Sequence, residues 1–155
     1  MNTENTTHTT PLLEARGATR SLERSTLLVD IDLSVPEGEF LAVMGPSGCG
    51  KSPLLHTLSG LEDPTAGSVL WAGEDHSSLS QRARSRHRLL VADEPTGALD
   101  SAAGEEVMDA LTEISARGTT IVLVTHDLDV ARRADRIVNM ADGRLSGELP
   151  SPPAA

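Results

Sequence analysis

The chain contains three short, mainly apolar runs, each about as long as one β-strand. They span Phe40–Met44, Leu89–Ala92 and Thr120–Val124. Continuous apolar runs of about four to eight residues are typical of strands in a parallel sheet that is covered on both faces. We therefore predict three buried strands, with Leu89–Ala92 fully buried like the other two, and a fourth strand at Arg136–Met140.

Segments with helical spacing separate these runs. Leu54–Leu58 reads as the opening of a helix after the first run, and Leu128–Ala134 as a short helix before the fourth strand. The longest helical segment, Ser101–Ala116, has its apolar residues at the spacing of one helix face. These residues are Val107, Leu111 and Ile114. Strands that alternate with helices predict an α/β fold with a mainly parallel sheet.

The first half of the chain also contains strands of a different kind. Leu27–Val35 alternates apolar and acidic residues, which is typical of a half-exposed strand. Ser68–Ala72 reads as another strand. Residues 1–10 and 150–155 are polar or proline-rich and are expected to be disordered tails. The remaining residues, 11–149, are expected to form a single domain.

Composition excludes several classes of partner. The formal net charge of −10 argues against nucleic-acid binding and against a basic membrane-surface patch. No apolar run approaches the length of a membrane span, and the N-terminus has no signal-peptide pattern. We therefore expect a cytoplasmic chain with no direct membrane insertion. The basic segment Ser77–Arg88 reads as a solvated helix face rather than as an anion contact.

A glycine-rich motif follows the first apolar run. It fits the phosphate-binding P-loop pattern G-x-x-x-x-G-K-[ST] at every fixed position. Its residues are Gly45, Pro46, Ser47, Gly48, Cys49, Gly50, Lys51 and Ser52. Strand, glycine loop and helix together form an anion site, because the loop amides and the helix N-terminus point at the phosphates. Lys51 is the only lysine in the chain. The alternative is a glycine-rich turn that fits by chance.

Cys49 is the only cysteine, so no internal disulfide is possible. It lies in the loop beside Lys51 and a helix N-terminus, where modification of the thiol would block nucleotide binding. The alternative is a small side chain that fits a tight loop.

Two carboxylates, Asp93 and Glu94, follow the apolar run Leu89–Ala92. At the C-terminal end of a strand they would face the crevice in which α/β sheets bind ligands. Asp93 would hold Mg²⁺ together with the Ser52 hydroxyl. Glu94 would polarise an attacking water. The alternative is an acidic strand end before a turn at Pro95.

A histidine, His126, follows the next strand on the same side of the predicted sheet. It is placed to hydrogen-bond the γ-phosphate and the attacking water. Considered alone, it would be read as a polar strand cap.

These motifs together resemble one family. The run Asp93–Ser101 looks like the Walker B motif and D-loop of ABC transporter ATP-binding subunits, most similar to the lipoprotein-release and macrolide-export branch. The segment Gly45–Val69 resembles the P-loop helix and following turn of that family, and His126 matches its switch histidine. The resemblance covers roughly residues 12–149. It implies ATP as ligand, Mg²⁺ as cofactor and ATP hydrolysis as activity.

The resemblance also implies the surroundings of the chain. An antiparallel β-portion would run from about Leu12 to Ala72. The D-loop residues Ala98, Leu99 and Asp100 would contact a second ATPase subunit. A separate transmembrane permease would hold the chain at the inner face of the plasma membrane.

The chain is shorter than this family between two of its motifs. Lys51 and Asp93 are 42 positions apart (93 − 51), whereas the interval in the family is more than about twice as long. The strand with the Q-loop, the helical subdomain and the Leu-Ser-Gly-Gly-Gln signature have no counterpart here. The excision falls near His87–Arg88. Its expected consequence is a contiguous core of four parallel strands with Leu89–Ala92 as an apolar edge.

Two single positions also depart from the family. Pro53 stands where threonine is usual, which removes an N–H and a hydroxyl that would meet the α-phosphate. Pro53 is therefore predicted to lie at the phosphate site, which has fewer hydrogen-bond donors than the same site in the family. Leu22 occupies the position of the adenine-stacking tyrosine, so apolar contact is kept and stacking is lost.

Two functions of different classes follow from these departures. The first is an ATP-binding subunit of an ABC transporter, with a heterodimer favoured because a homodimer offers no signature motif to either site. The second is a catalytically silent remnant that binds at most nucleotide or pairs with a full-length relative. A third hypothesis is an unrelated P-loop NTPase with a short insert, against which the run Asp93–Ser101 and His126 argue.

Overall fold

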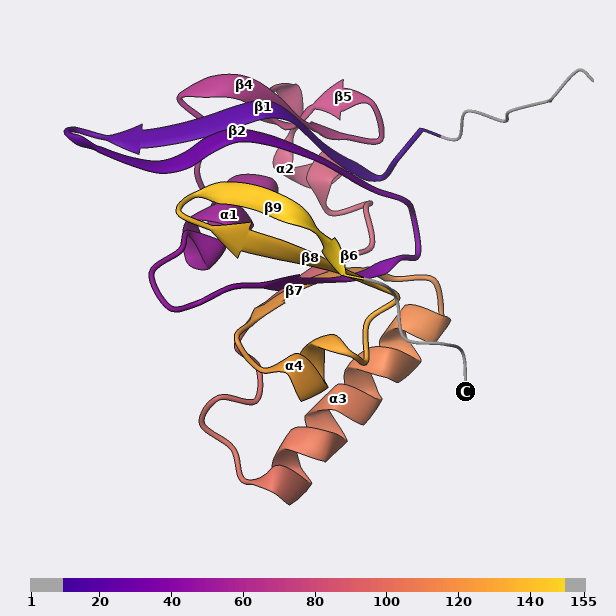
Figure 1. Cartoon of the computed structure of the whole chain (residues 1–155). Helices are drawn as coiled ribbons and strands as arrows, with labels where there is room; N and C mark the ends of the chain where they lie inside the picture. Colours follow the sequence, from indigo (N-terminus) through magenta and orange to yellow (C-terminus); the bar gives the residue numbers. More distant parts are fainter. Residues whose placement is uncertain (1–9, 150–155) are drawn as a thin grey trace, which may run out of the picture.

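The structure is a computed structural model that describes residues 10–149. The described residues form two β-sheets. Helix α1 (Lys51–Leu58) lies between them, and α3 (Ser101–Ala116) and α4 (Leu128–Ala131) lie on the far side of the second sheet (Figure 1). The expected tails, apart from Thr10, lie outside the described residues.

The first sheet is antiparallel and comes from the first half of the chain. Its strand order is β2-β1-β4-β5. The strands are β1 (Leu13–Leu22), β2 (Ser25–Val35), β4 (Ala66–Trp71) and β5 (Glu74–Asp75). This sheet is the expected N-terminal antiparallel β-portion. Its register shifts repeatedly along β1, where bulges interrupt the pairing with β2.

The second sheet has the order β6-β7-β3-β8-β9. The strands are β6 (Leu89–Asp93), β7 (Thr120–Thr125), β3 (Phe40–Met44), β8 (Arg136–Ala141) and β9 (Arg144–Leu149). The first four are parallel, and β9 returns antiparallel to β8 after a turn. The expected contiguous set of four parallel strands is therefore present.

The helices of the described residues are α1 (Lys51–Leu58), η1 (His76–Ser78), α2 (Gln81–Arg84), α3 (Ser101–Ala116) and α4 (Leu128–Ala131).

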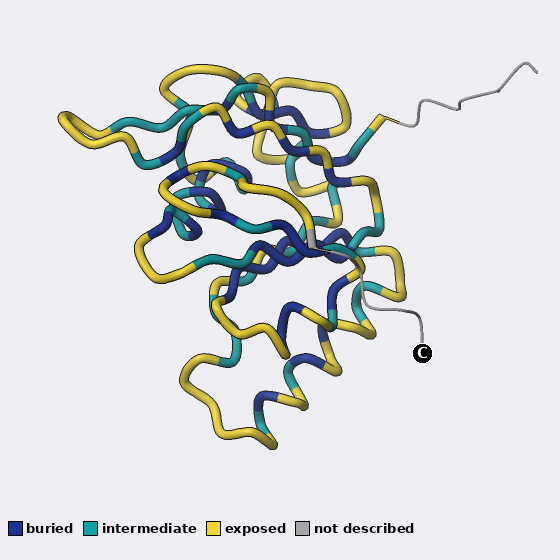
Figure 2. The backbone as a smooth tube through the Cα atoms, in the orientation of Figure 1, coloured by how far each residue is buried: buried dark blue, intermediate teal, exposed yellow. Residues whose placement is uncertain are grey.

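Alternating side chains of the second sheet build two hydrophobic cores, one on each face of the sheet. Leu41 and Val43 of β3 pack toward α1 and the antiparallel sheet, whereas Phe40 and Ala42 pack toward α3 and α4. Because both faces of β3 and β7 are covered, every residue of β7 and the first four residues of β3 are buried (Figure 2).

The prediction that Leu89–Ala92 is fully buried is wrong. This segment is β6, the last strand of the sheet, and among the described strands it pairs only with β7. Val91 is 37% exposed, and no residue of β6 is buried. Run length alone does not distinguish a central strand from an edge strand, because sheet order decides which one it is. The expected apolar edge is confirmed.

The polar segment after the antiparallel sheet contains only short helices. η1 and the four-residue α2 occupy it, and α2 has no buried residue, as a solvated helix face requires. The helix predicted over Leu128–Ala134 is shorter than expected: α4 ends at Ala131.

Candidate functional site

The glycine-rich loop joins the C-terminal end of β3 to the first residue of α1. Gly50 lies at the helix N-cap with φ 108°, a conformation that side chains disfavour. Gly45 sits against the neighbouring strand, where a Cβ atom would lie 2.4 Å from the Met140 carbonyl oxygen and 2.5 Å from Cys49 Sγ. Both positions therefore require glycine, and the loop is packed tightly against the sheet.

Lys51 is enclosed by this loop. Its side chain is 8% exposed, and Nζ donates hydrogen bonds to the carbonyl oxygens of Gly45 at 2.5 Å and Pro46 at 2.9 Å. No carboxylate of the described residues forms an ion pair with it. A buried ammonium without an acidic partner favours a bound anion, since charges in protein interiors are normally compensated.

Cys49 fills the space behind the loop. It is 4% exposed, and its Sγ lies 4.0 Å from Lys51 Nζ. Its carbonyl accepts a hydrogen bond from Gly143 N–H at 2.7 Å, which ties the loop to the turn after β8. This enclosure supports the interpretation that a small side chain is needed for packing.

Ser52 and Asp93 come together from opposite sides of the crevice. Ser52 Oγ, in the first turn of α1, donates to Asp93 Oδ2 at the end of β6 over 2.7 Å. Mg²⁺ prefers oxygen ligands and is commonly held by one or two protein oxygens plus phosphates and water. Within residues 10–149 no cluster of three or more His, Cys, Asp or Glu side chains could hold a metal. The pair Ser52–Asp93 therefore fits Mg²⁺ that arrives with a phosphate ligand.

Glu94 is oriented by the end of the neighbouring strand β7. It has φ 45°, so the chain leaves β6 sharply at this residue. Its carboxylate accepts hydrogen bonds from Thr125 Oγ1 at 3.1 Å and from His126 N–H at 2.9 Å. His126 Nδ1 lies 2.8 Å from Glu94 Oε1, while the imidazole side chain is 63% exposed. These contacts hold the Glu94 carboxylate in one orientation, and the carboxylate in turn positions the imidazole ring of His126.

These groups line one depression of about 380 Å³. Its lining residues are Ser47, Gly48, Gly50, Lys51, Ser52, Pro53, Asp93 and Glu94. Most of the predicted phosphate-site residues therefore meet at one place. Gly45, Pro46 and Cys49 support it from behind, and His126 joins it through Glu94.

A second hollow of about 480 Å³ continues from the other side of the loop. Thr26 and Leu27 of β2 line it, together with Gly48, Pro53 and the turn Asp142–Gly143. Leu22, the predicted adenine contact, is 51% exposed at the end of the β1–β2 hairpin and is not among the lining residues. Sequence reasoning missed Thr26 and Leu27, because the hairpin turn that places them has no strong sequence signal.

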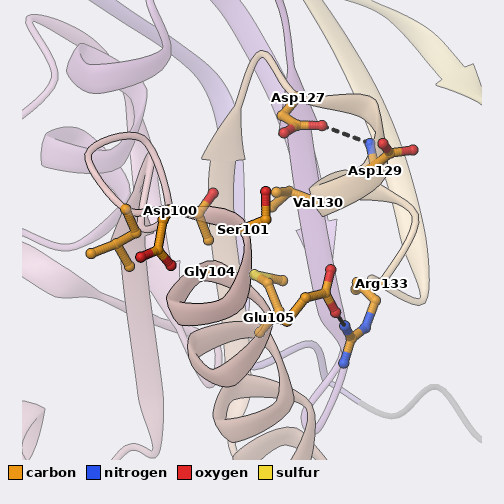
Figure 3. Close-up of a pocket in the computed structure, with 11 residues that line it drawn as sticks. Asp100, Ser101, Gly104, Glu105, Asp127, Asp129, Val130 and Arg133 are labelled. Carbon is orange, nitrogen blue, oxygen red and sulfur yellow. Dashed lines mark hydrogen bonds and ion pairs between the residues drawn. The ribbon is translucent and has the colours of Figure 1, made fainter.

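The predicted subunit-contact residues lie apart from the phosphate site. Leu99, Asp100 and the start of α3 face α4 across a hollow of about 250 Å³ (Figure 3). Asp100 caps α3 by accepting a hydrogen bond from Ala103 N–H at 2.8 Å. Leu99 is 43% exposed, and Ala98 is exposed beside it. Their contact with a second subunit stays a prediction.

Fold and site together define a P-loop nucleotide-binding domain with a cassette-type arrangement of two sheets. The chain belongs to the ABC transporter family: the family model described as "ABC transporter" matches residues 28–148. No helix of the described residues is long and apolar enough to cross a membrane.

Two relatives show the branch of the family. The chain is 30% identical over 229 residues to the macrolide export ATP-binding/permease protein MacB 2 of Aeromonas hydrophila subsp. hydrophila, covering 94% of this chain and 35% of that protein. It is 30% identical over 219 residues to the pyoverdine export ATP-binding/permease protein PvdT of Pseudomonas syringae pv. tomato, covering 86% of this chain and 33% of that protein.

The chain thus spans about a third of the length of these relatives. The first alignment runs over 229 positions, so at least 74 of them (229 − 155) have no counterpart in this chain. This shortfall agrees with the internal truncation expected from the motif spacing.

Solved structures show the same fold. The ATP-binding cassette MJ0796, in a dimeric post-hydrolysis state bound to ADP and Pi, superposes with a TM-score of 0.76 at 24% identity, covering 92% of this chain and 100% of that chain. A nucleotide-free ATP-binding cassette from an ABC transporter gives a TM-score of 0.80 at 14% identity, covering 91% of this chain and 92% of that chain.

Proposed function

We propose that this chain binds Mg·ATP and serves as an ATP-binding subunit of an ABC transporter. The observation that supports this most directly is the Ser52–Asp93 contact of 2.7 Å beside the enclosed Lys51 ammonium. A cation-binding oxygen pair next to an uncompensated positive charge is complementary to a metal–phosphate ligand. A solvated acidic strand end would need neither feature.

Each residue of the site then has one role. Lys51 and the amides of Ser47–Ser52 bind the phosphates, and Pro53 borders them without donating a hydrogen bond. Ser52 and Asp93 hold Mg²⁺, whose charge neutralises the phosphate oxygens when it is bound. Glu94 accepts a proton from the attacking water, and His126 lies beside it to contact the γ-phosphate.

The partners follow from what the chain lacks. Because it carries no signature motif, a second, complete ATPase subunit supplies that motif to this site, and a heterodimer is favoured over a homodimer. Leu99 and Asp100 lie on the exposed surface that would meet this subunit. A separate transmembrane permease couples the pair to transport and holds the chain at the cytoplasmic face of the plasma membrane.

A silent, truncated remnant is the second candidate. Two observations favour it: the exposed β6 edge, and the shortfall of at least 74 positions (229 − 155) against the relative from Aeromonas hydrophila. In this case the chain binds at most nucleotide, or pairs with a full-length relative, and hydrolyses nothing.

Nucleotide titration followed by an ATPase assay separates the two candidates. Saturable Mg·ATP binding that is lost in Lys51→Ala supports the proposed binding site, whereas no binding at millimolar Mg·ATP leaves only the remnant. Hydrolysis is then compared between the unchanged chain and Glu94→Gln, each with a full-length cassette added. We expect Glu94→Gln to slow turnover by about 10²–10⁴-fold while binding is retained, the usual range for a general base. Equal rates would remove Glu94 from this role.

A further inference from the structure

The free edge of the second sheet is a regular, apolar strand without a partner. β6 pairs with β7 in register from Leu89 to Asp93 without a bulge, and among the described strands nothing pairs with its other side. Exposed edges of this kind are normally blocked by charges, bulges or a covering segment. Here the strand carries Leu89, which packs partly against the core, and Val91, which is 37% exposed.

The other sheet edges do not share these features. β5 has only two residues, and β2 carries Asp30 and Asp32, with Asp30 at φ 47°. β9 carries Arg144 and Glu148, and its register with β8 is irregular. Edge pairing is therefore favoured at β6.

The backbone bonds to β7 determine which groups of β6 are available. Thr120 N–H donates to the Arg88 carbonyl, and Glu94 N–H donates to the Val124 carbonyl, both over 2.9 Å. In a parallel ladder alternate residues bond to the same neighbour, so residues 88, 90, 92 and 94 face β7. The backbone groups of Leu89, Val91 and Asp93 consequently face the free edge. The Leu89 N–H is already bonded to the His87 carbonyl at 3.0 Å, which leaves Val91 and Asp93 as donors.

The charges at the two ends of β6 favour a second copy of the same strand as the partner of the free edge. The strand is preceded by Arg86, His87 and Arg88 and ends in Asp93 and Glu94. A second copy in antiparallel orientation places the basic end of one strand beside the acidic end of the other. A parallel copy would place like charges together, which costs free energy.

We propose that two copies of this chain associate through antiparallel pairing of β6 with β6 about a two-fold axis at Val91, a contact distinct from the pairing with a complete ATPase subunit proposed above. Directly opposed residues of an antiparallel ladder both face the partner, so Val91 stands opposite Val91 and Leu89 opposite Asp93. The basic segment before β6 in one copy then lies near the acidic end of β6, at Asp93, in the other. Pairing joins the two second sheets into one and closes both β6 edges, so the assembly stops at two copies. It does not depend on nucleotide.

The first test is the mass of the full chain in solution. Sedimentation from low to high concentration should show a shift from 16.3 kDa to twice that mass, and added salt should weaken the association. Val91→Pro removes an N–H that faces the free edge without breaking a bond to β7, so it should remain folded by circular dichroism and be monomeric. Val91→Thr keeps the N–H and should still dimerise. A chain that is monomeric at every concentration, or that grows beyond two copies, overturns the proposal.

Cross-linking tests the register, including the case in which Val91→Pro fails to fold. In a Cys49→Ala background, Val91→Cys should form a disulfide-linked dimer on oxidation, because opposed Cα atoms of a hydrogen-bonded pair lie about 5.5 Å apart. Leu89→Cys should not link to itself, since its opposite is Asp93. Leu128→Cys, with a similar 39% exposure, controls for random collision. Equal cross-linking of Val91→Cys and Leu128→Cys would mean that no such pairing exists.

Discussion

His126 Nδ1 lies 2.8 Å from Glu94 Oε1, and the same carboxylate oxygen accepts the backbone N–H of His126 at 2.9 Å. The histidine ring and the carboxylate are thus positioned by one another, at the ends of two adjacent parallel strands. Because Glu94 is also bonded to Thr125 Oγ1, its orientation does not depend on the ring alone.

This arrangement separates the roles of the two residues. In the heterodimer with a full-length cassette, His126→Ala should slow ATP hydrolysis by about tenfold or more while changing the Kd for Mg·ATP little, because Glu94 keeps two donors, Thr125 Oγ1 and the backbone N–H of residue 126. Single-turnover hydrolysis and nucleotide titration measure the two effects. Thr125→Val, which removes another donor to Glu94, is the matched variant. An equal loss of binding in His126→Ala would show that the ring holds the ground state instead.

Mg²⁺ should be required for tight nucleotide binding. Asp93→Asn removes the negative charge of the proposed site and Ser52→Ala removes its hydroxyl oxygen, so each should reduce the gain in ATP affinity that Mg²⁺ produces. Binding of ATP in the presence of a chelator should be nearly unchanged in both. Titration with and without Mg²⁺ measures the difference. Asp100→Asn, a carboxylate outside the site, should behave like the unchanged chain.

Pro53→Thr should strengthen nucleotide binding. Threonine restores an N–H and a hydroxyl at the border of the phosphate depression, and a hydrogen bond to a charged group is worth about 1.5–3 kcal/mol. Since about 1.4 kcal/mol is a tenfold change, one restored bond should lower the Kd by at least about tenfold. Pro53→Ala restores only the N–H and should give an intermediate affinity. Unchanged binding in both would place the phosphates elsewhere.

His76 should make the fold sensitive to acid. Its side chain is 1% exposed, and burial lowers its pKa below the ordinary value of 6.5; nearby Arg84 acts in the same direction, while Asp63 and Asp75 oppose it. Between pH 6.5 and the lower pKa of the folded chain, the unfolded chain binds a proton at His76 that the folded chain does not bind. The free energy of unfolding therefore falls as the pH falls, by at most about 1.4 kcal/mol per pH unit for one proton.

Urea denaturation between about pH 5 and 8 measures this slope. His76→Gln, which cannot be protonated, should remove one proton's share of the acid destabilisation. His56→Gln, at a less buried histidine of α1, is the matched control substitution. An identical pH dependence in His76→Gln and the unchanged chain would exclude His76 as its source.

The sequence by itself determined the parts of the site that are local. The P-loop, Asp93, Glu94 and His126 each follow directly after an apolar run. Because the C-terminal ends of parallel strands share one edge of the sheet, the runs alone predicted that these residues lie together. The motifs also identified the family, and their spacing, compared with that family, predicted the missing interval.

Only the tertiary structure decided the features that depend on sheet order and hairpin geometry. Leu89–Ala92 reads like the buried run Thr120–Val124, and its exposure follows from its place at the end of the sheet. Thr26 and Leu27, rather than Leu22, line the hollow beside the P-loop because the register of β1 and β2 places them there. His76 is buried by packing near Trp71, which no local pattern records. Local patterns determine which residues form a strand, whereas contacts between distant segments determine what each strand faces.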